Sequence, residues 1–135
     1  MVPFYSLCLA RAYADINQFE DARRSIGEAT TAVEAGKERW FEAEVYRTAG
    51  EIALKAREDR AKIVAHFNQA LTIARAQQAK SWELRATMSM ARLWYDEGKR
   101  KEARDLVVPI HGWFTEGFET RDLKEARGLL GELSP

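Results

Sequence analysis

Cysteine and proline are scarce in this chain of 135 residues, and neither sign of charge is in excess. The one cysteine, Cys8, cannot form an internal disulfide, which fits a reducing cytoplasm. We interpret Cys8 as a small core or groove residue. Lys plus Arg and Asp plus Glu each number 21, so net charge gives no reason to expect nucleic acid as a partner. No apolar run approaches the roughly 20 residues that span a bilayer, and no signal-peptide pattern opens the sequence. We therefore expect a cytoplasmic protein that does not bind membranes.

Motifs for catalysis and for cofactors are also missing from the sequence. Neither glycine-rich phosphate-binding pattern occurs. The histidines, His66 and His111, have no carboxylate or thiolate at helical spacing, which argues against a metal site. Glu42 and Glu44 point to different faces of a helix and do not form a catalytic carboxylate pair. The sequence therefore predicts no enzyme activity, no catalytic residue, no cofactor and no metal.

Strand signals are nearly absent, since β-branched residues do not alternate with polar ones over any useful length. Spacings of three and four between apolar residues instead predict helices. Gly36 and Gly98 mark two of the turns, while Ser81 and Thr120 are the expected N-caps of two helices. The expected helices cover about residues 3–15, 19–35, 39–56, 60–78, 81–97, 99–115 and 121–133.

Two sets of apolar positions recur along the chain at steps of 40 to 41 residues, and a period of this length indicates a stacked repeat. The set in the second helix of each pair is Ala22, Ile26, Ala29 and Val33, then Ile63, Phe67, Ala70 and Ala74, then Ala103, Val107, Ile110 and Phe114. The set in the first helix is Leu9, Ala10 and Tyr13, then Ala49, Gly50 and Ala53, then Met90, Ala91 and Trp94.

Small residues recur in one column of these repeats, at Ala10, Gly50 and Ala91. A large side chain at the closest crossing of two helices would hold their backbones apart, so small residues are expected there. Gly50 costs roughly 1 kcal/mol inside a helix relative to alanine. Tight packing is one reason for it, and a backbone kink is the alternative.

These columns resemble the tetratricopeptide repeat, over about residues 3–118. The matching residues are Leu9-Ala10 with Tyr13, Asn17-x-Phe19 with Ala22, Gly50, Phe67 with Ala70, Ala91 with Trp94, and Gly98 with Ala103. The resemblance implies an all-α, right-handed α-solenoid of three helix pairs, with repeats at about 3–36, 39–79 and 81–118. The helix at 121–133 is then a C-terminal cap. The period is longer than the family's 34 residues, so longer helices are expected.

Four stretches of the chain also resemble the C-terminal repeat region of large bacterial signalling proteins. They cover residues 70–86, 98–106, 112–118 and 122–126. In those proteins an adenylate or guanylate cyclase domain, or a transcription-regulator domain, precedes an ATPase module and the repeats. The resemblance implies that this chain is the tail of such a protein, and it transfers no catalytic residue.

The resemblance further implies a concave groove lined by the first helix of each pair. The residues expected there include Leu7, Arg11, Glu44, Arg47, Glu51, Arg85, Met88, Arg92 and Tyr95. The arginines could bind carboxylates of a partner, or they could pair with neighbouring acids. Trp82, Trp113 and Tyr95 are further candidates for contact with a partner, although Trp82 and Phe41 occupy equivalent columns and could instead pack between repeats.

Two functions fit this pattern. The first is a non-catalytic module that binds a protein, a peptide or other domains of its parent chain. The second is a small-ligand sensor that uses the concave groove. We also expect Phe4, Tyr5 and Leu7 to form an exposed apolar stacking patch at the N-terminal end, where a homodimer could form.

Overall fold

The computed structural model describes residues 2–34, 41–115 and 120–133, except for the side chains of residues 2–6 and 34. Throughout these ranges the secondary structure is helix, joined by short turns, which confirms the all-α prediction. Seven helices lie in this described part: α1 (Val2–Asp15), α2 (Phe19–Glu34), α3 (Glu42–Lys55), α4 (Arg60–Ala76), α5 (Lys80–Asp96), α6 (Arg100–Trp113) and α7 (Arg121–Leu133).

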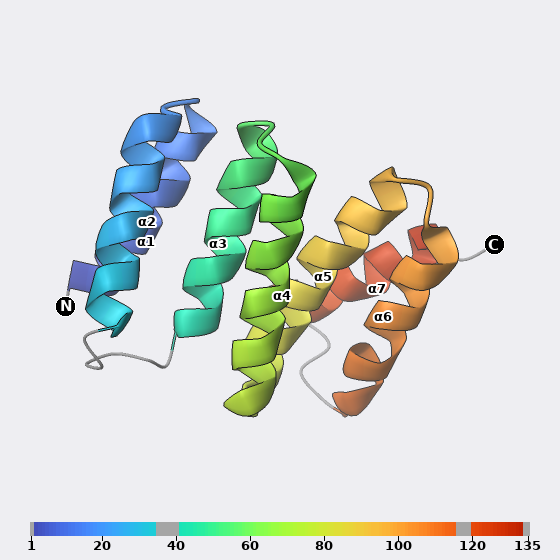
Figure 1. Cartoon of the computed structure of the whole chain (residues 1–135). Coiled ribbons are helices and arrows are strands. Elements are labelled where there is room, and N and C mark those ends of the chain that lie inside the picture. Colours follow the sequence, from blue (N-terminus) through green and yellow to red (C-terminus); the bar gives the residue numbers. More distant parts are fainter. Residues whose placement is uncertain (1, 35–40, 116–119, 134–135) are drawn as a thin grey trace.

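Each helix packs against the next one along the chain, and α1, α3, α5 and α7 also contact one another in that order. Figure 1 shows the helices side by side, with the first and last on opposite sides of the molecule. Within the described residues α1 contacts only α2 and α3. Alternate helices therefore form one shared face, and residues about 40 positions apart meet across it.

Four of the turns between helices have the same backbone geometry. After α1, α3, α4 and α5 one residue takes a positive φ: Asn17 (63°), Arg57 (57°), Gln78 (55°) and Gly98 (83°). The next amide N–H donates to a carbonyl five residues earlier, as from Gln18 to Tyr13 at 2.8 Å and from Lys99 to Trp94 at 2.8 Å. This hydrogen bond is the signature of a Schellman motif, which satisfies the last carbonyls of a helix.

The repeated apolar columns form most of the core. Ten of the twelve second-helix positions are buried, and the other two, Ile26 and Phe114, are partly buried and pack against core residues. Ala10, Gly50 and Ala91 are also buried. The last helix adds Leu123, Ala126, Leu129 and Leu133 to a cluster with residues of α5 and α6.

Three details differ from the sequence-based expectations. α5 begins at Lys80, and Ala79 rather than Ser81 occupies the N-cap position, with no side-chain cap hydrogen bond. Cys8 is exposed rather than in the core, whereas Leu7 is 2% exposed and packs with Ala29, Val33, Phe41 and Val45. Leu7 is therefore not part of an exposed patch. The side chains of Phe4 and Tyr5, and the expected turn at Gly36, lie outside the described residues.

Candidate functional site

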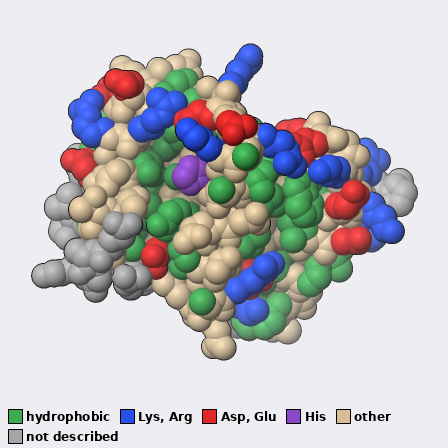
Figure 2. Space-filling view, in the orientation of Figure 1, with side chains coloured by type: hydrophobic (Ala, Val, Ile, Leu, Met, Phe, Trp, Pro, Cys, Tyr) green, Lys and Arg blue, Asp and Glu red, His purple; other side chains and the backbone are tan. Residues whose placement is uncertain are grey.

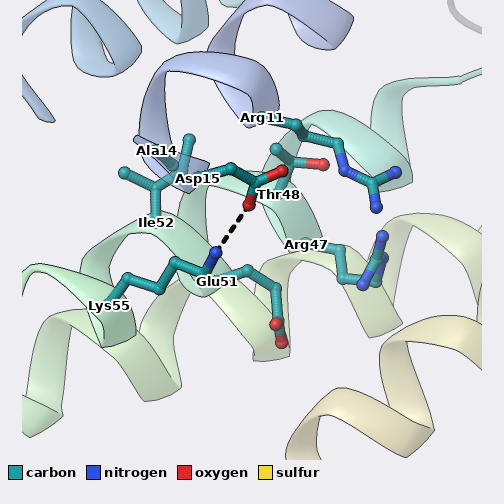
Figure 3. A pocket seen from close by; sticks show the side chains of 8 residues that line it. All are labelled: Arg11, Ala14, Asp15, Arg47, Thr48, Glu51, Ile52 and Lys55. Carbon is teal, nitrogen blue, oxygen red and sulfur yellow. Dashed lines mark hydrogen bonds and ion pairs between the residues drawn. The ribbon is translucent and has the colours of Figure 1, made fainter. Parts of the chain in front are cut away.

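Two adjoining hollows lie on the face shared by the alternate helices. The smaller, of about 150 Å³, lies between α1 and α3 and is lined by Arg11, Ala14, Asp15, Arg47, Thr48, Glu51, Ile52 and Lys55 (Figure 3). The larger, of about 300 Å³, extends to α5 and α7 and is lined by Arg11, Arg47, Glu51, Arg85, Met88, Arg92, Arg121, Asp122 and Glu125. Since they share Arg11, Arg47 and Glu51, we treat both hollows together as one groove.

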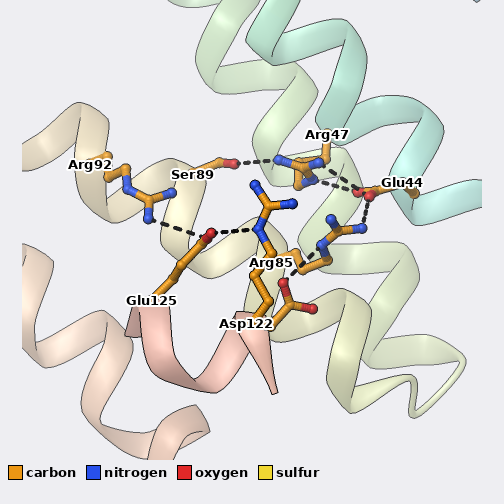
Figure 4. A network of polar contacts seen from close by, with 8 residues as sticks. Glu44, Arg47, Arg85, Ser89, Arg92, Asp122 and Glu125 are labelled. Atoms are coloured by element: carbon orange, nitrogen blue, oxygen red, sulfur yellow. Dashed lines mark hydrogen bonds and ion pairs between the residues drawn. The ribbon is translucent and has the colours of Figure 1, made fainter. Parts of the chain in front are cut away.

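A buried carboxylate holds two of the groove's arginines. Glu44 is only 3% exposed, and it accepts hydrogen bonds from the Nε of Arg47, from the Nη2 of Arg47 at 3.2 Å, and from the Nη1 of Arg85 (Figure 4). The Arg47 Nη1 also donates to the Ser89 hydroxyl at 3.3 Å. Because a buried carboxylate is costly unless it is paired, these two guanidinium groups account for its place in the fold.

Burial and charge act in opposite directions on Arg47. Burial lowers the pKa of Arg47, but its hydrogen bond to Glu44 and the negative charges of Glu44, Glu51 and Asp122 outweigh burial and raise that pKa. The guanidinium group is therefore firmly charged, and it faces the groove from a nearly buried position.

Arg85 extends the network from α3 to α7. Its Nε lies 3.4 Å from Asp122 Oδ1, and its guanidinium carbon lies 5.7 Å from the centre of the Trp82 ring. Arg92 lies 3.7 Å from Glu125, which also accepts a hydrogen bond from Arg121 at 2.9 Å. That hydrogen bond is the main reason that the pKa of Glu125 is lowered, although burial acts against it. Arg47, Arg85 and Arg92 thus pair with acids of this chain, as one of the two sequence-based interpretations predicts.

Arg11 and Glu51 differ from their neighbours in the groove. Within the part of the chain that the structure describes, neither side chain forms a hydrogen bond or an ion pair. Close by, Lys55 donates to Asp15 at 2.6 Å, which lowers the pKa of Asp15. The groove therefore offers one cation and one anion that form no ion pair with a described side chain, although the charge of Glu51 acts on Arg47 and that of Arg11 acts on Asp15.

The other predicted groove residues are less accessible. Met88 lines the larger hollow but is 2% exposed, and Glu44 and Leu7 are buried. Tyr95 lines neither hollow, because it packs against the cluster between α5, α6 and α7, with Arg100 over its ring at 5.5 Å. Trp82 packs against the core cluster that contains Phe41, which agrees with a packing role for both, whereas Trp113 is 57% exposed beside Lys80.

The sequence pattern does not reveal that α7 contributes Asp122 and Glu125 to the larger hollow. Nor does it reveal that Glu44, which is expected in the groove, is buried. A usable signal exists for both Glu44 and Asp15, since the partner of each lies about one repeat further on: Glu44 meets Arg85, and Asp15 meets Lys55. In both pairs, opposite charges about 40 residues apart in the sequence meet across this face.

No strong charge of one sign covers the surface in Figure 2, where positive, negative and hydrophobic side chains are mixed. The described residues contain no cluster of three or more potential metal ligands among His, Cys, Asp and Glu. Nor does any helix within the described ranges have the length and apolar character needed to cross a membrane. Comparison with protein-family models, with curated proteins and with solved structures finds no match.

Proposed function

We propose that this chain is a non-catalytic interaction module that binds a polypeptide segment along the groove across α1, α3, α5 and α7. In this proposal it is a right-handed, tetratricopeptide-like α-solenoid of three helix pairs with α7 as its cap. The contacts between alternate helices support the solenoid, because stacked repeats contact only their neighbours. The segment belongs to another protein or to other domains of a parent signalling protein, as the resemblance to bacterial repeat regions implies.

One observation supports this function above others, namely that the two hollows share three lining residues, Arg11, Arg47 and Glu51. A site that crosses four helices fits an extended chain better than a compact molecule. Its lining combines five arginines with three acids in the larger hollow alone. Complementary charges give specificity more than affinity, so the expected segment contains both acidic and basic residues.

Selection from a displayed library of random peptides tests the proposal. We expect enriched peptides of mixed charge that bind the wild-type chain and bind Arg92→Glu at least about tenfold more weakly, which corresponds to about 1.4 kcal/mol. Arg92 lines only the larger hollow and is exposed, so the variant should fold. The matched control is Arg104→Glu, an equal change of charge at an exposed position of α6.

Hydrogen exchange should also show which helices the bound peptide contacts. Protection is expected on α1, α3, α5 and α7, with little change on α6. Selected peptides that bind Arg92→Glu and Arg104→Glu equally, or that protect α2 and α4 instead, would contradict the groove as the binding site.

A further inference from the structure

The smaller hollow is lined by charges of both signs. Arg11, Arg47 and Lys55 supply three positive groups, while Asp15 and Glu51 supply two negative groups. Asp15 with Lys55 and Glu44 with Arg47 already form ion pairs. Among the described residues that line the hollow, this leaves Arg11 and Glu51 without an ion pair, so a ligand with one anionic group for Arg11 and one cationic group for Glu51 fits the hollow.

The charged groups that line the hollow lie at different ends of it. Figure 3 shows the guanidinium groups of Arg11 and Arg47 together at one end of the hollow, with the Asp15–Lys55 pair toward the other end. Glu44 already pairs with Arg47 from outside the hollow, but no described acid forms an ion pair with Arg11, so an anion beside Arg11 is favoured. A carboxylate fits this role well, since guanidinium groups bind it with paired, charge-assisted hydrogen bonds.

The size and the walls of the hollow limit the rest of the ligand. A cavity of about 150 Å³ is known to accept a molecule as large as benzene, which means about six non-hydrogen atoms. Ala14 and Ile52 supply apolar wall, so a short alkyl group is expected there. Thr48 also lines the hollow, and its buried hydroxyl has no hydrogen-bond partner among the described residues.

We propose that the hollow between α1 and α3 binds a small aliphatic α-amino acid as its zwitterion, with the carboxylate between Arg11 and Arg47. The ammonium group lies against Glu51, and the alkyl side chain contacts Ala14 and Ile52. This site goes beyond the proposed peptide-binding function, and it needs only α1 and α3. It makes the chain a sensor whose groove is occupied by a metabolite at one end.

Isothermal titration calorimetry of the whole chain with L-alanine tests the site. We expect saturable binding to one site with a Kd of about 1 mM or tighter. Propionate lacks the ammonium group and ethylamine lacks the carboxylate, so each should bind at least about tenfold more weakly. Arg11→Ala should weaken L-alanine about tenfold, and Glu51→Gln should weaken L-alanine similarly while leaving propionate unchanged.

Arg104→Ala is the matched control, because Arg104 is exposed on α6 and lines neither hollow, and it should keep the affinity for L-alanine within about twofold. Circular dichroism establishes that each variant is folded. No saturable binding of glycine, L-alanine or L-valine would overturn the proposal, as would wild-type affinity in Arg11→Ala. The peptide site is tested separately through Arg92→Glu, so a failure of one proposal leaves the other measurable.

Discussion

The ring of Phe67 occupies the space into which a side chain at Gly50 would project. A Cβ atom placed on Gly50 would lie 2.5 Å from Phe67 Cε1 and 2.7 Å from Phe67 Cδ1. Real Cβ atoms essentially never show contacts this short, so α3 and α4 pack this closely only because position 50 has no side chain. This contact supports tight packing, rather than a kink, as the reason for glycine inside α3.

Gly50→Ala should therefore destabilise the protein, by about 1–3 kcal/mol, because Phe67 must shift within a packed core. Helix propensity alone would predict the opposite sign. Gly27→Ala is the matched control, since Gly27 is also inside a helix but has nothing within 4 Å of its added Cβ. It should stabilise the protein by about 0.5–1 kcal/mol. Urea unfolding of both variants measures the difference, and equal effects would rule out the close contact.

Removal of the Glu44 charge should weaken the contact between α3 and α5. Glu44→Gln leaves Arg47 and Arg85 without their shared carboxylate, and loss of one partner from a buried ion pair costs about 3 kcal/mol. Glu125→Gln, which weakens a more exposed pair, should cost less than about 1 kcal/mol. Thermal melting compares the two. A Glu44→Gln variant as stable as the wild type would show that the network does not stabilise the fold.

His66 should make stability depend on pH. Burial lowers the pKa of His66, a shift that the nearby Glu58 opposes and the nearby Lys62 reinforces. The unfolded imidazole keeps a pKa near 6.5, so just below that pH the unfolded chain binds more protons than the folded one. The stability that comes from burying the neutral imidazole of His66 is therefore complete above this pH. It decreases as the pH falls toward the pKa that His66 has in the folded state.

Urea unfolding between about pH 5.5 and 8 tests this sign, with His66→Gln for comparison. The wild type should lose stability relative to the variant as the pH falls below 6.5. A stability difference that stays constant, or that grows as the pH rises, would contradict the burial of a neutral imidazole.

Gln78 ends α4 in a left-handed conformation that favours glycine, with φ at 55°. Gln78→Gly should therefore stabilise the protein by about 1 kcal/mol, because a side chain is strained there. The converse change at the equivalent turn after α5, Gly98→Ala, should destabilise by a similar amount. Melting temperatures that move in the same direction for both variants would argue against the shared turn geometry.

Deletion of residues 120–135 should promote aggregation. The buried face of α7, including Leu123 and Leu129, covers Leu84, Val107 and Ile110 of α5 and α6. Without α7 these apolar side chains would be exposed as one patch, which favours association. Sedimentation velocity should detect oligomers of the shortened chain. A monomer with the same melting temperature as the full chain would show that α7 is not a cap.

The helices and most of the core could be predicted from the sequence, because the apolar columns keep a helical spacing within each repeat. The sequence could not predict which face of α1 is buried. Leu7 and Cys8 are adjacent in the sequence, and which of them is buried depends on how α1 docks against α2 and α3. Local periodicity contains no information about that rotation.

The groove was harder to predict than the core. Arg11, Arg47, Arg85 and Arg92 line the two hollows, but so does Arg121, which was not expected there, and the carboxylate that holds Arg85, Glu44, lies about 40 residues away in the sequence. The positive φ of Arg57 and Gln78 could not be predicted from the sequence either, since neither residue type favours that conformation. The surrounding packing imposes these conformations, so they follow from the complete fold alone.

Because α1 and α2 contact no helix beyond α3 within the described residues, no described interface joins the two ends of the molecule. Local fraying of the first two helices would break contacts with α3 and leave those among α4, α5, α6 and α7 intact. A load applied to α1 would therefore reach α7 only through the helices between them, of which α3 and α5 are the shortest route.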